Sequence, residues 1–257
     1  ESLLANQINL RHTNRKITPR QELDETVLNK LSSLINQTEH AKLTWVTDVE
    51  KLKNLGAISS HADLLRMFID EAHTDFIEKE MRWNLAEVLE TENGIGIHTL
   101  DLSNNDNIGL QLIKDKRTVE FLKQIEGGSA FKRIALQQFL SSSAVGLISM
   151  PTNNVKNFIN CGMAAERLWL AATALDLQIH PVNVPLIFFY KNSIEKNLNI
   201  PEKDKAILTN LEYNFKNIFS LSQQEQAMFM FRIFKATPSP ERTIRKSRKK
   251  ILSIGRA

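Results

Sequence analysis

The chain has 257 residues, of which 42% are hydrophobic and 24% charged, a composition typical of a soluble globular protein with one large domain or two small ones. No apolar run approaches eighteen residues, so we expect no transmembrane helix and no signal peptide, and the single cysteine, Cys161, excludes an internal disulfide and favours a cytoplasmic location. The net charge of +4 comes from residues 242–250, RTIRKSRKK, because the remainder has fewer basic than acidic side chains, and this argues against a nucleic-acid-binding face.

The first half of the chain reads as helices with little strand. Thr18 and Pro19 are suited to the cap and first turn of a helix. The apolar spacing predicts helices over 19–36, 48–55 and 59–90, a short strand over 42–46 (KLTWV) and an extended stretch over 94–102.

The second half contains the best strand candidate, AVGLISM at 144–150, and a long helix over 153–177. This helix has many glycine and alanine residues and few charges, so we expect it to be the buried central helix of the domain. Pro181 and Pro185 are expected to end it in an apolar loop. Further helices are predicted over 107–140, broken at Gly127-Gly128, and over 201–217, with a last strand over 227–236. Scattered strands among helices indicate an α+β fold.

Several motifs typical of enzymes are better explained as ordinary structure. FIDEAH (68–73) resembles a helicase acidic box, but the chain has no GxxxxGK[ST] loop, so a helix with a solvated acidic face is the better interpretation. The histidines at 61, 73, 98 and 180 show no i, i+4 pairing and no HExxH frame, so we expect no metal site. Cys161 lies in the buried helix and is interpreted as a small hydrophobic residue rather than a nucleophile.

Two basic segments have the chemistry to bind a phosphate group. The first is residues 11–16, RHTNRK, and the second is residues 242–250. Arginine presents a planar fork that matches phosphate oxygens, and a neighbouring hydroxyl such as that of Thr13 can complete the shell. Either segment alone is more often a solvated surface, but the two together favour an anionic ligand.

The two segments and the central helix resemble the FMN-dependent nitroreductase superfamily, in the order that family shows. INLRHTNRKITPRQELDETVLNKLSSL (8–34) is similar to its opening, CGMAAERLWLAATALDLQIHPVNVPL (161–186) to its central helix and the loop beside the flavin ring, and FMFRIFKATPSPERTIRKSRKKIL (229–252) to its last strand and basic segment. Asp176 stands where the family often has glycine. The resemblance implies a central antiparallel or mixed sheet flanked by helices. It also implies one FMN-binding domain over 1–257, with 237–257 at the flavin or partner interface.

A further stretch is similar to a divergent branch of that superfamily. DEAHTDFIEKEMRWN (70–84), followed by NGIGIHTLDL (93–102), resembles proteins in which the nitroreductase-like unit is doubled within one chain, some with a ThiF-like adenylation domain in front. In such proteins the second half supplies most of one flavin site and the first half replaces the dimer partner. The resemblance therefore implies a homodimer, or a pseudo-dimer with another nitroreductase-like half.

The resemblance also assigns site residues. It implies that Arg11 and Thr13 hold the phosphate and ribityl chain, that His12 adds backbone and ring contacts, and that Arg15 is next in line. The backbone of Val182, Asn183 and Val184 would edge the isoalloxazine ring. In the basic tail it favours Arg242 and Arg245, or Lys246 and Arg248 in a shifted register.

The implied activity is hydride transfer from NAD(P)H through FMN to a small-molecule acceptor that the sequence does not identify. Two family features are missing. INQTEHAKLTWV (35–46) has no Pro-Trp pair, and HPVNVPL (180–186) has no acidic-Gly pair. The alternative is therefore a flavin-sequestering or regulatory module without turnover. No catalytic acid or base is assigned, and neither a nucleic acid nor a membrane is expected as a partner.

Overall fold

The computed structural model describes residues 2–196, 198–239 and 241–251, which form two compact units. The first unit is Glu1–Arg66 with Gly128–Pro238, and the second is Met67–Gly127 with Ser239–Ala257. Each unit is described by itself.

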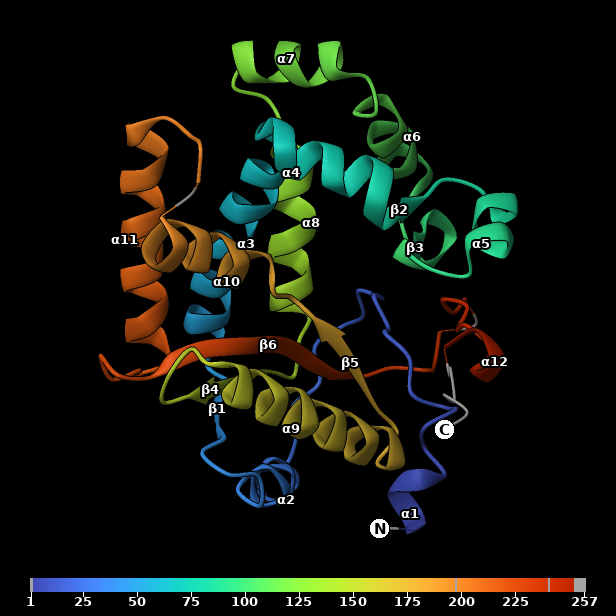
Figure 1. Ribbon diagram of the computed structural model, residues 1–257, viewed down its shortest axis with the longest axis vertical. Coiled ribbons are helices and arrows are strands. Elements are labelled where there is room, and N and C mark those ends of the chain that lie inside the picture. Colours follow the sequence, from blue (N-terminus) through green and yellow to red (C-terminus); the bar gives the residue numbers. More distant parts are fainter. Residues whose placement is uncertain (1, 197, 240, 252–257) are drawn as a thin grey trace, which may run out of the picture. The chain divides into compact units, whose positions relative to one another are not determined.

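The first unit contains the larger sheet and the longest helices (Figure 1). Its elements are α1 (Ser2–Ala5), α2 (Glu25–Ile35), β1 (Lys42–Val46), α3 (Val49–Phe68, whose last two residues enter the second unit), α8 (Ser129–Leu140), β4 (Ala144–Met150), α9 (Val155–Ala174), β5 (Leu177–Pro181), α10 (Val184–Phe189), the π-helix η3 (Tyr190–Glu195), α11 (Glu202–Ile218) and β6 (Gln226–Lys235).

The second unit is built from short elements. They are α4 (Asp70–Thr74), the π-helix η1 (Asp75–Glu80), β2 (Met81–Arg82), α5 (Leu85–Thr91), β3 (Ile95–Gly96), the 3-10 helix η2 (Ile97–Leu100), α6 (Asn104–Leu112), α7 (Lys116–Gln124) and α12 (Arg248–Ile251). The β2 and β3 strands pair in parallel.

The four strands of the first unit form a sheet in the order β1-β4-β6-β5, with every neighbouring pair antiparallel. All seven residues of β4 are buried, as expected for a central strand of a sheet that is covered on both faces. Helices α2 and α9 lie on one face of the sheet, and α3, α8, α10 and α11 lie on the other (Figure 1). This three-layer arrangement confirms the predicted α+β fold.

The central helix α9 packs on the sheet through its small residues. Ala164, Leu168 and Ala172 are fully buried in a core that also contains Leu31 and Ile35 of α2. Small side chains let the helix axis come close to the strands, so the predicted role of this helix is confirmed. Phe231 and Ile233 of β6 belong to the same core.

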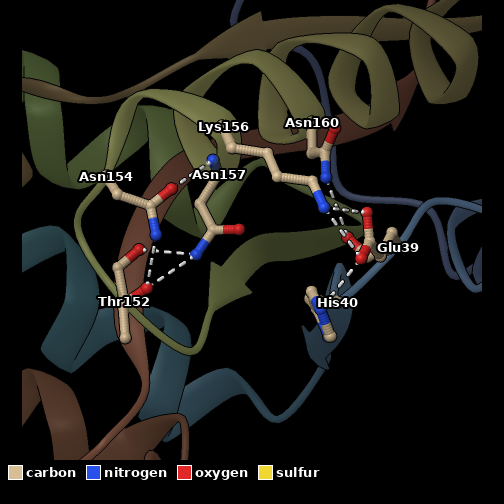
Figure 2. A network of polar contacts seen from close by, with 7 residues as sticks. All are labelled: Glu39, His40, Thr152, Asn154, Lys156, Asn157 and Asn160. Atoms are coloured by element: carbon tan, nitrogen blue, oxygen red, sulfur yellow. Dashed lines mark hydrogen bonds and ion pairs between the residues drawn. The ribbon is translucent and has the colours of Figure 1, made fainter.

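The N-terminal half of α9 is held by a polar network (Figure 2). The Asn154 side chain caps the helix by accepting from the Asn157 N–H at 2.8 Å. In the first turn, Lys156 pairs with the Glu39 carboxylate at 2.7 Å, and one turn further Asn160 donates to the Glu39 backbone carbonyl at 3.4 Å. These contacts tie one flank of α9 to the loop after α2.

Two helix boundaries in the first half differ from the prediction. The helix predicted from residue 19 begins at Glu25, because the Asp24 carboxylate accepts from the Thr26 N–H at 2.8 Å and caps it there. The break predicted at 56–58 is absent and α3 runs through it. Gly56 serves instead as a close-packing position, since a Cβ there would lie 2.9 Å from Leu136 Cδ1.

Three further segments differ. The helix predicted over 59–90 is interrupted at β2, and the extended stretch over 94–102 is a two-residue strand followed by a 3-10 helix. The apolar loop predicted at 181–185 is preceded by β5 and enters α10, with Pro185 in the first turn where its missing N–H is tolerated. Asp176, between α9 and β5, has φ 56°, which explains why glycine suits that position.

None of the helices within the described residues is both long enough and apolar enough to cross a membrane.

Candidate functional site

The basic segment Arg11–Lys16 lies along the free edge of β5. Thr13 forms a parallel bridge with Ile179, and the Asn14 N–H donates to the Ile179 carbonyl at 3.1 Å. This pairing places the segment beside the strand that leads directly into residues 182–184. The structure therefore brings the two sets of predicted flavin-binding residues in the first unit to one edge of its sheet.

The Asn14 side chain anchors this segment. It is fully buried, and its Nδ2 donates to Gln178 Oε1 at 3.0 Å and to the Thr237 carbonyl at 3.1 Å. Its Oδ1 accepts from the Lys16 N–H at 3.1 Å. A buried amide needs such partners to offset its desolvation, so this bonding specifies one backbone path on both sides of Arg15.

Arg11 and His12 precede the anchor and have partners of their own. The Arg11 Nε lies 2.9 Å from Glu166 Oε1, and its guanidinium lies 4.6 Å from the centre of the Trp169 ring. The His12 Nδ1 donates to the Leu10 carbonyl at 2.9 Å. Arg11 is thus oriented by α9, and a phosphate bound there would share the guanidinium with Glu166.

Arg15 is the more desolvated of the two arginines in the Arg11–Lys16 segment. Burial lowers the pKa of Arg15 to about 10, so the side chain is still charged at neutral pH. A cation that has lost hydration gains more from an approaching anion than a solvated one does. This makes Arg15 the best phosphate-binding candidate in the segment.

A fully buried arginine, Arg232 of β6, contacts the same region of the first unit. Its Nη2 donates to the Lys16 carbonyl at 2.6 Å and its Nε to His180 Nδ1 at 3.0 Å, while Nη1 donates to the Gln138 carbonyl and to Ser141 Oγ, both at 3.1 Å. Burial, and then the charges of Arg232 and Arg15, hold the pKa of His180 well below its usual value. His180 is therefore neutral and can accept through Nδ1.

The loop at 182–184 is fastened to β6. The Val182 N–H donates to the Met230 carbonyl at 2.9 Å, and Asn183 Oδ1 accepts from the Met230 N–H at 2.7 Å. Val184 is the first residue of α10. Because the Val182 amide is already bonded to the sheet, the predicted amide contacts to the flavin ring rest on Asn183 and Val184.

The tail arginines Arg242 and Arg245 belong to the second unit, where both are exposed. That unit holds the segment through the pair of Lys250 Nζ with Glu92 Oε1 at 2.9 Å. A phosphate shared between these arginines and Arg11 stays a prediction. Within the predicted interface 237–257, residues 240 and 252–257 lie outside the described ranges.

A half-buried carboxyl in α3, that of Asp63, gives a pH-dependent prediction. Burial raises the pKa of Asp63 to about 6, partly opposed by Arg66. Because the unfolded-state pKa is about 3.9, the folded state holds this proton more tightly, and the stability it contributes is lost as pH rises through 6. Asp63→Asn should therefore raise the free energy of unfolding by about 1–3 kcal/mol at pH 8 and leave it unchanged near pH 3.5.

Urea unfolding at the two pH values would measure this difference. Glu50→Gln, at an exposed position of the same helix, is the matched control and should shift stability by less than about 0.5 kcal/mol at both. An equal gain for Asp63→Asn at pH 3.5 and pH 8 would contradict the assignment.

Comparison with known proteins supports the fold. No protein-family model matches the chain. The uncharacterized protein MT1398 of Mycobacterium tuberculosis (strain CDC 1551 / Oshkosh) is 22% identical over 200 residues, which are 78% of this chain and 27% of that protein. The chain thus spans about a quarter of the length of this curated relative.

The solved structures that are similar include three nitroreductases. An FMN-bound nitroreductase from Bacteroides fragilis has a TM-score of 0.55 at 9% identity, with 98% of each chain covered. An FMN-bound nitroreductase from Desulfitobacterium hafniense has 0.53 at 10%, also with 98% of each covered. The FMN-dependent nitroreductase NfnB from Mycobacterium smegmatis, in complex with NADPH, has 0.52 at 12%, with 99% of each covered. The chain therefore has the nitroreductase-like fold.

The donor set of this chain fits the phosphate of FMN. Arg11, Thr13 and Arg15 offer two guanidinium forks and a hydroxyl within five residues, on a segment whose backbone is fixed at Asn14. The sequence analysis missed Arg232 as a member of this neighbourhood, and it considered His180 only as a possible metal ligand, which it rejected. The sequence does contain a signal for Arg232, because it is a single arginine within the apolar run AMFMFRIF (227–234). A charge is rarely buried in a strand unless it has partners, so such an arginine indicates a polar site.

Proposed function

We propose that this chain is an FMN-binding oxidoreductase of the nitroreductase-like class that works in the cytoplasm, with NAD(P)H as electron donor and a small molecule as acceptor. The observation that carries the proposal is the Arg11–Lys16 segment on the edge of β5, beside the loop 182–184. When bound, the flavin supplies the hydride chemistry. The residues of this chain would bind its phosphate through Arg11, Thr13 and Arg15 and orient its ring along Asn183 and Val184.

The direct test is to mix the purified protein with excess FMN and separate them by gel filtration. We expect oxidised-flavin absorbance to elute with the protein, and we expect the Arg11→Ala/Arg15→Ala double variant to elute with much less. A colourless wild-type protein would reject the cofactor assignment.

A module that binds flavin without turnover is the second candidate. Two observations favour it: Arg11 is already paired with Glu166, and the Val182 amide is already bonded to Met230. Oxidation of NADH or NADPH by the FMN-loaded protein separates the candidates. Turnover with either nucleotide supports the oxidoreductase, whereas bound flavin that neither nucleotide reduces supports the sequestering or regulatory module.

We also propose that a second nitroreductase-like unit covers the outer face of α9. Val155, Ile159 and Met163 are spaced four residues apart on this face and are 75%, 59% and 55% exposed. A Cβ added at Gly162 would meet nothing within 4 Å, so another helix could approach closely there. Apolar stripes of this kind usually mark interfaces. The partner is a second copy or, in a longer chain of the doubled branch with or without an adenylation domain, the other half.

Replacing Ile159 with glutamate should therefore weaken self-association. A charge in the middle of an apolar interface loses hydration without gaining a partner, so we expect a shift from dimer to monomer in light scattering at micromolar concentration. Tyr213→Glu, at an exposed position of α11, is the control and should leave the oligomeric state unchanged. A wild-type protein that is a stable, soluble monomer would contradict the homodimer, and unchanged dimerisation of Ile159→Glu would contradict this interface.

A further inference from the structure

Arg232 is a fully buried charge in the middle of an apolar strand. Its side chain has no exposed surface, and its guanidinium lies 4.3 Å from the centre of the Phe234 ring. The hydrogen bonds described above go to neutral acceptors: two backbone carbonyls, a hydroxyl and a neutral imidazole. Burying a guanidinium is expensive, and well-packed apolar replacements of buried charges are often neutral or stabilising. Fold stability alone therefore gives a weak reason for an arginine here.

The bonds of Arg232 converge from three separate segments of the first unit. One goes to the Lys16 carbonyl in the basic segment, one to His180 in β5, and two to the end of α8. The Lys16 bond, at 2.6 Å, is the shortest of the four. Arg232 thus links the basic segment to the sheet, although Arg232 and Lys16 lie far apart in the sequence.

Arg232 and Asn14 together fix the backbone on both sides of Arg15. Asn14 ties the preceding residue to β5 and to Thr237, and Arg232 ties the following residue to β6. The Arg232 Nε donates to His180 Nδ1 at 3.0 Å, and burial, together with the charges of Arg232 and Arg15, lowers the pKa of His180. Because the residues before and after Arg15 are both fixed, Arg15 loses little backbone conformational entropy when a ligand binds.

We propose that Arg232 is a positioning residue: it holds the Lys16 carbonyl so that Arg15 is presented to the phosphate of the flavin, without touching the ligand itself. The inference rests on the proposed function. It states that one buried side chain fixes the backbone geometry of the phosphate-binding segment. Its chemical consequence is selective, because only ligands that carry the phosphate should depend on Arg232.

The experiment compares FMN with riboflavin, which lacks the phosphate. Arg232→Met keeps an unbranched apolar stem of similar length and removes the bonds to Lys16 and His180. We expect its Kd for FMN to rise at least tenfold and its Kd for riboflavin to stay within twofold of wild type. Arg232→Lys, which keeps the charge but offers no fork, should recover part of the FMN affinity. Arg20→Met is the matched control, because Arg20 also donates to a backbone carbonyl, that of Thr47 at 3.0 Å, and should leave both Kd values unchanged.

Hydrogen exchange of the ligand-free proteins provides a second readout. In Arg232→Met the amide of Asn14, bonded to Ile179 in the wild type, should exchange faster, whereas amides in the centre of β4 should not. If Arg232→Met does not fold, Asn14→Ala releases the same segment from its other flank and should show the same selective loss of FMN.

The outcomes separate the inference from the function on which it rests. Unchanged FMN affinity in Arg232→Met, or equal losses for FMN and riboflavin, would reject the positioning role while leaving the proposed function in place. A wild-type protein that binds no FMN would reject both.

Discussion

Replacing Arg15 with alanine should lower the affinity for FMN by about 1.5–3 kcal/mol, roughly a 10- to 150-fold rise in Kd. The reason is that burial has already removed much of the hydration of this guanidinium, as its lowered pKa of about 10 indicates. A charge-assisted hydrogen bond to a phosphate dianion then replaces little water and is of the strong kind. Equilibrium titration followed by flavin fluorescence would measure the change.

Related variants test the same interaction. Arg15→Lys should recover only part of the loss, because an ammonium group supplies charge without the planar fork. Arg11→Ala should cause a smaller loss, because the Arg11 guanidinium is shared with Glu166. The double variant should lose less than the sum, since both residues would share one phosphate.

Riboflavin serves as the ligand control and Arg20→Ala as the protein control. Riboflavin should bind the wild type weakly and respond little to any of these substitutions. Arg20 pairs with Glu22 at 3.0 Å and donates to Thr47, so its loss should leave FMN binding unchanged. If Arg15→Ala and Arg11→Ala reduce FMN and riboflavin affinity equally, or reduce neither, the Arg11–Lys16 segment does not bind the phosphate and the flavin site lies elsewhere.

The sequence predicted those parts of the fold whose local signals agree with their tertiary setting. The apolar run of β4, the small residues of α9 and the glycine break before α8 each specify their element without help from distant residues. The boundary at Glu25 was missed because two signals compete: Pro19 is a good helix start, but Asp24 is a better cap. The strand β5 was missed because prolines near its end suggested a loop, whereas Pro181 lies at the last position of a strand.

The candidate site was predictable only where its chemistry is local. Arg11, Thr13 and Arg15 stand out because cations and a hydroxyl cluster within five residues. Asn14 and Arg232 do not, because their role depends on contacts across 164 and 216 positions of sequence, to Gln178 and to Lys16. The role of a buried polar residue depends on the partners that surround it in the folded chain, and a single sequence does not identify those partners.

The largest expected effect on stability is at Gly146, in the centre of β4. Its neighbours across the sheet are Trp45 and Phe231, whose rings meet edge to face with centroids 5.5 Å apart. A Cβ at Gly146 would lie 2.8 Å from Phe231 Cε1 and 2.8 Å from Trp45 Cζ3, closer than real side chains come. Glycine is required here because both rings occupy the space above it.

Gly146→Val should therefore lower the free energy of unfolding by about 3 kcal/mol, even though valine suits strands better than glycine. The intrinsic strand preference is worth at most about 1 kcal/mol, whereas inserting methyl groups into a packed core typically costs 1–3 kcal/mol and sometimes more. The rings cannot easily move away, since Phe231 is fully buried and the Trp45 Nε1 donates to Ser32 Oγ at 2.9 Å. Urea unfolding would measure the loss.

A compensating variant and a matched glycine make this test specific. Phe231→Leu removes the ring atoms nearest the new side chain, so Gly146→Val/Phe231→Leu should be clearly more stable than the sum of the single losses implies, with a coupling energy of about 1 kcal/mol or more. Gly109→Ala is the control: its Cβ would meet nothing within 4 Å in α6, and it should raise stability by up to about 1 kcal/mol. Strictly additive losses at Gly146 and Phe231, or a stabilising Gly146→Val, would show that ring crowding does not explain the glycine.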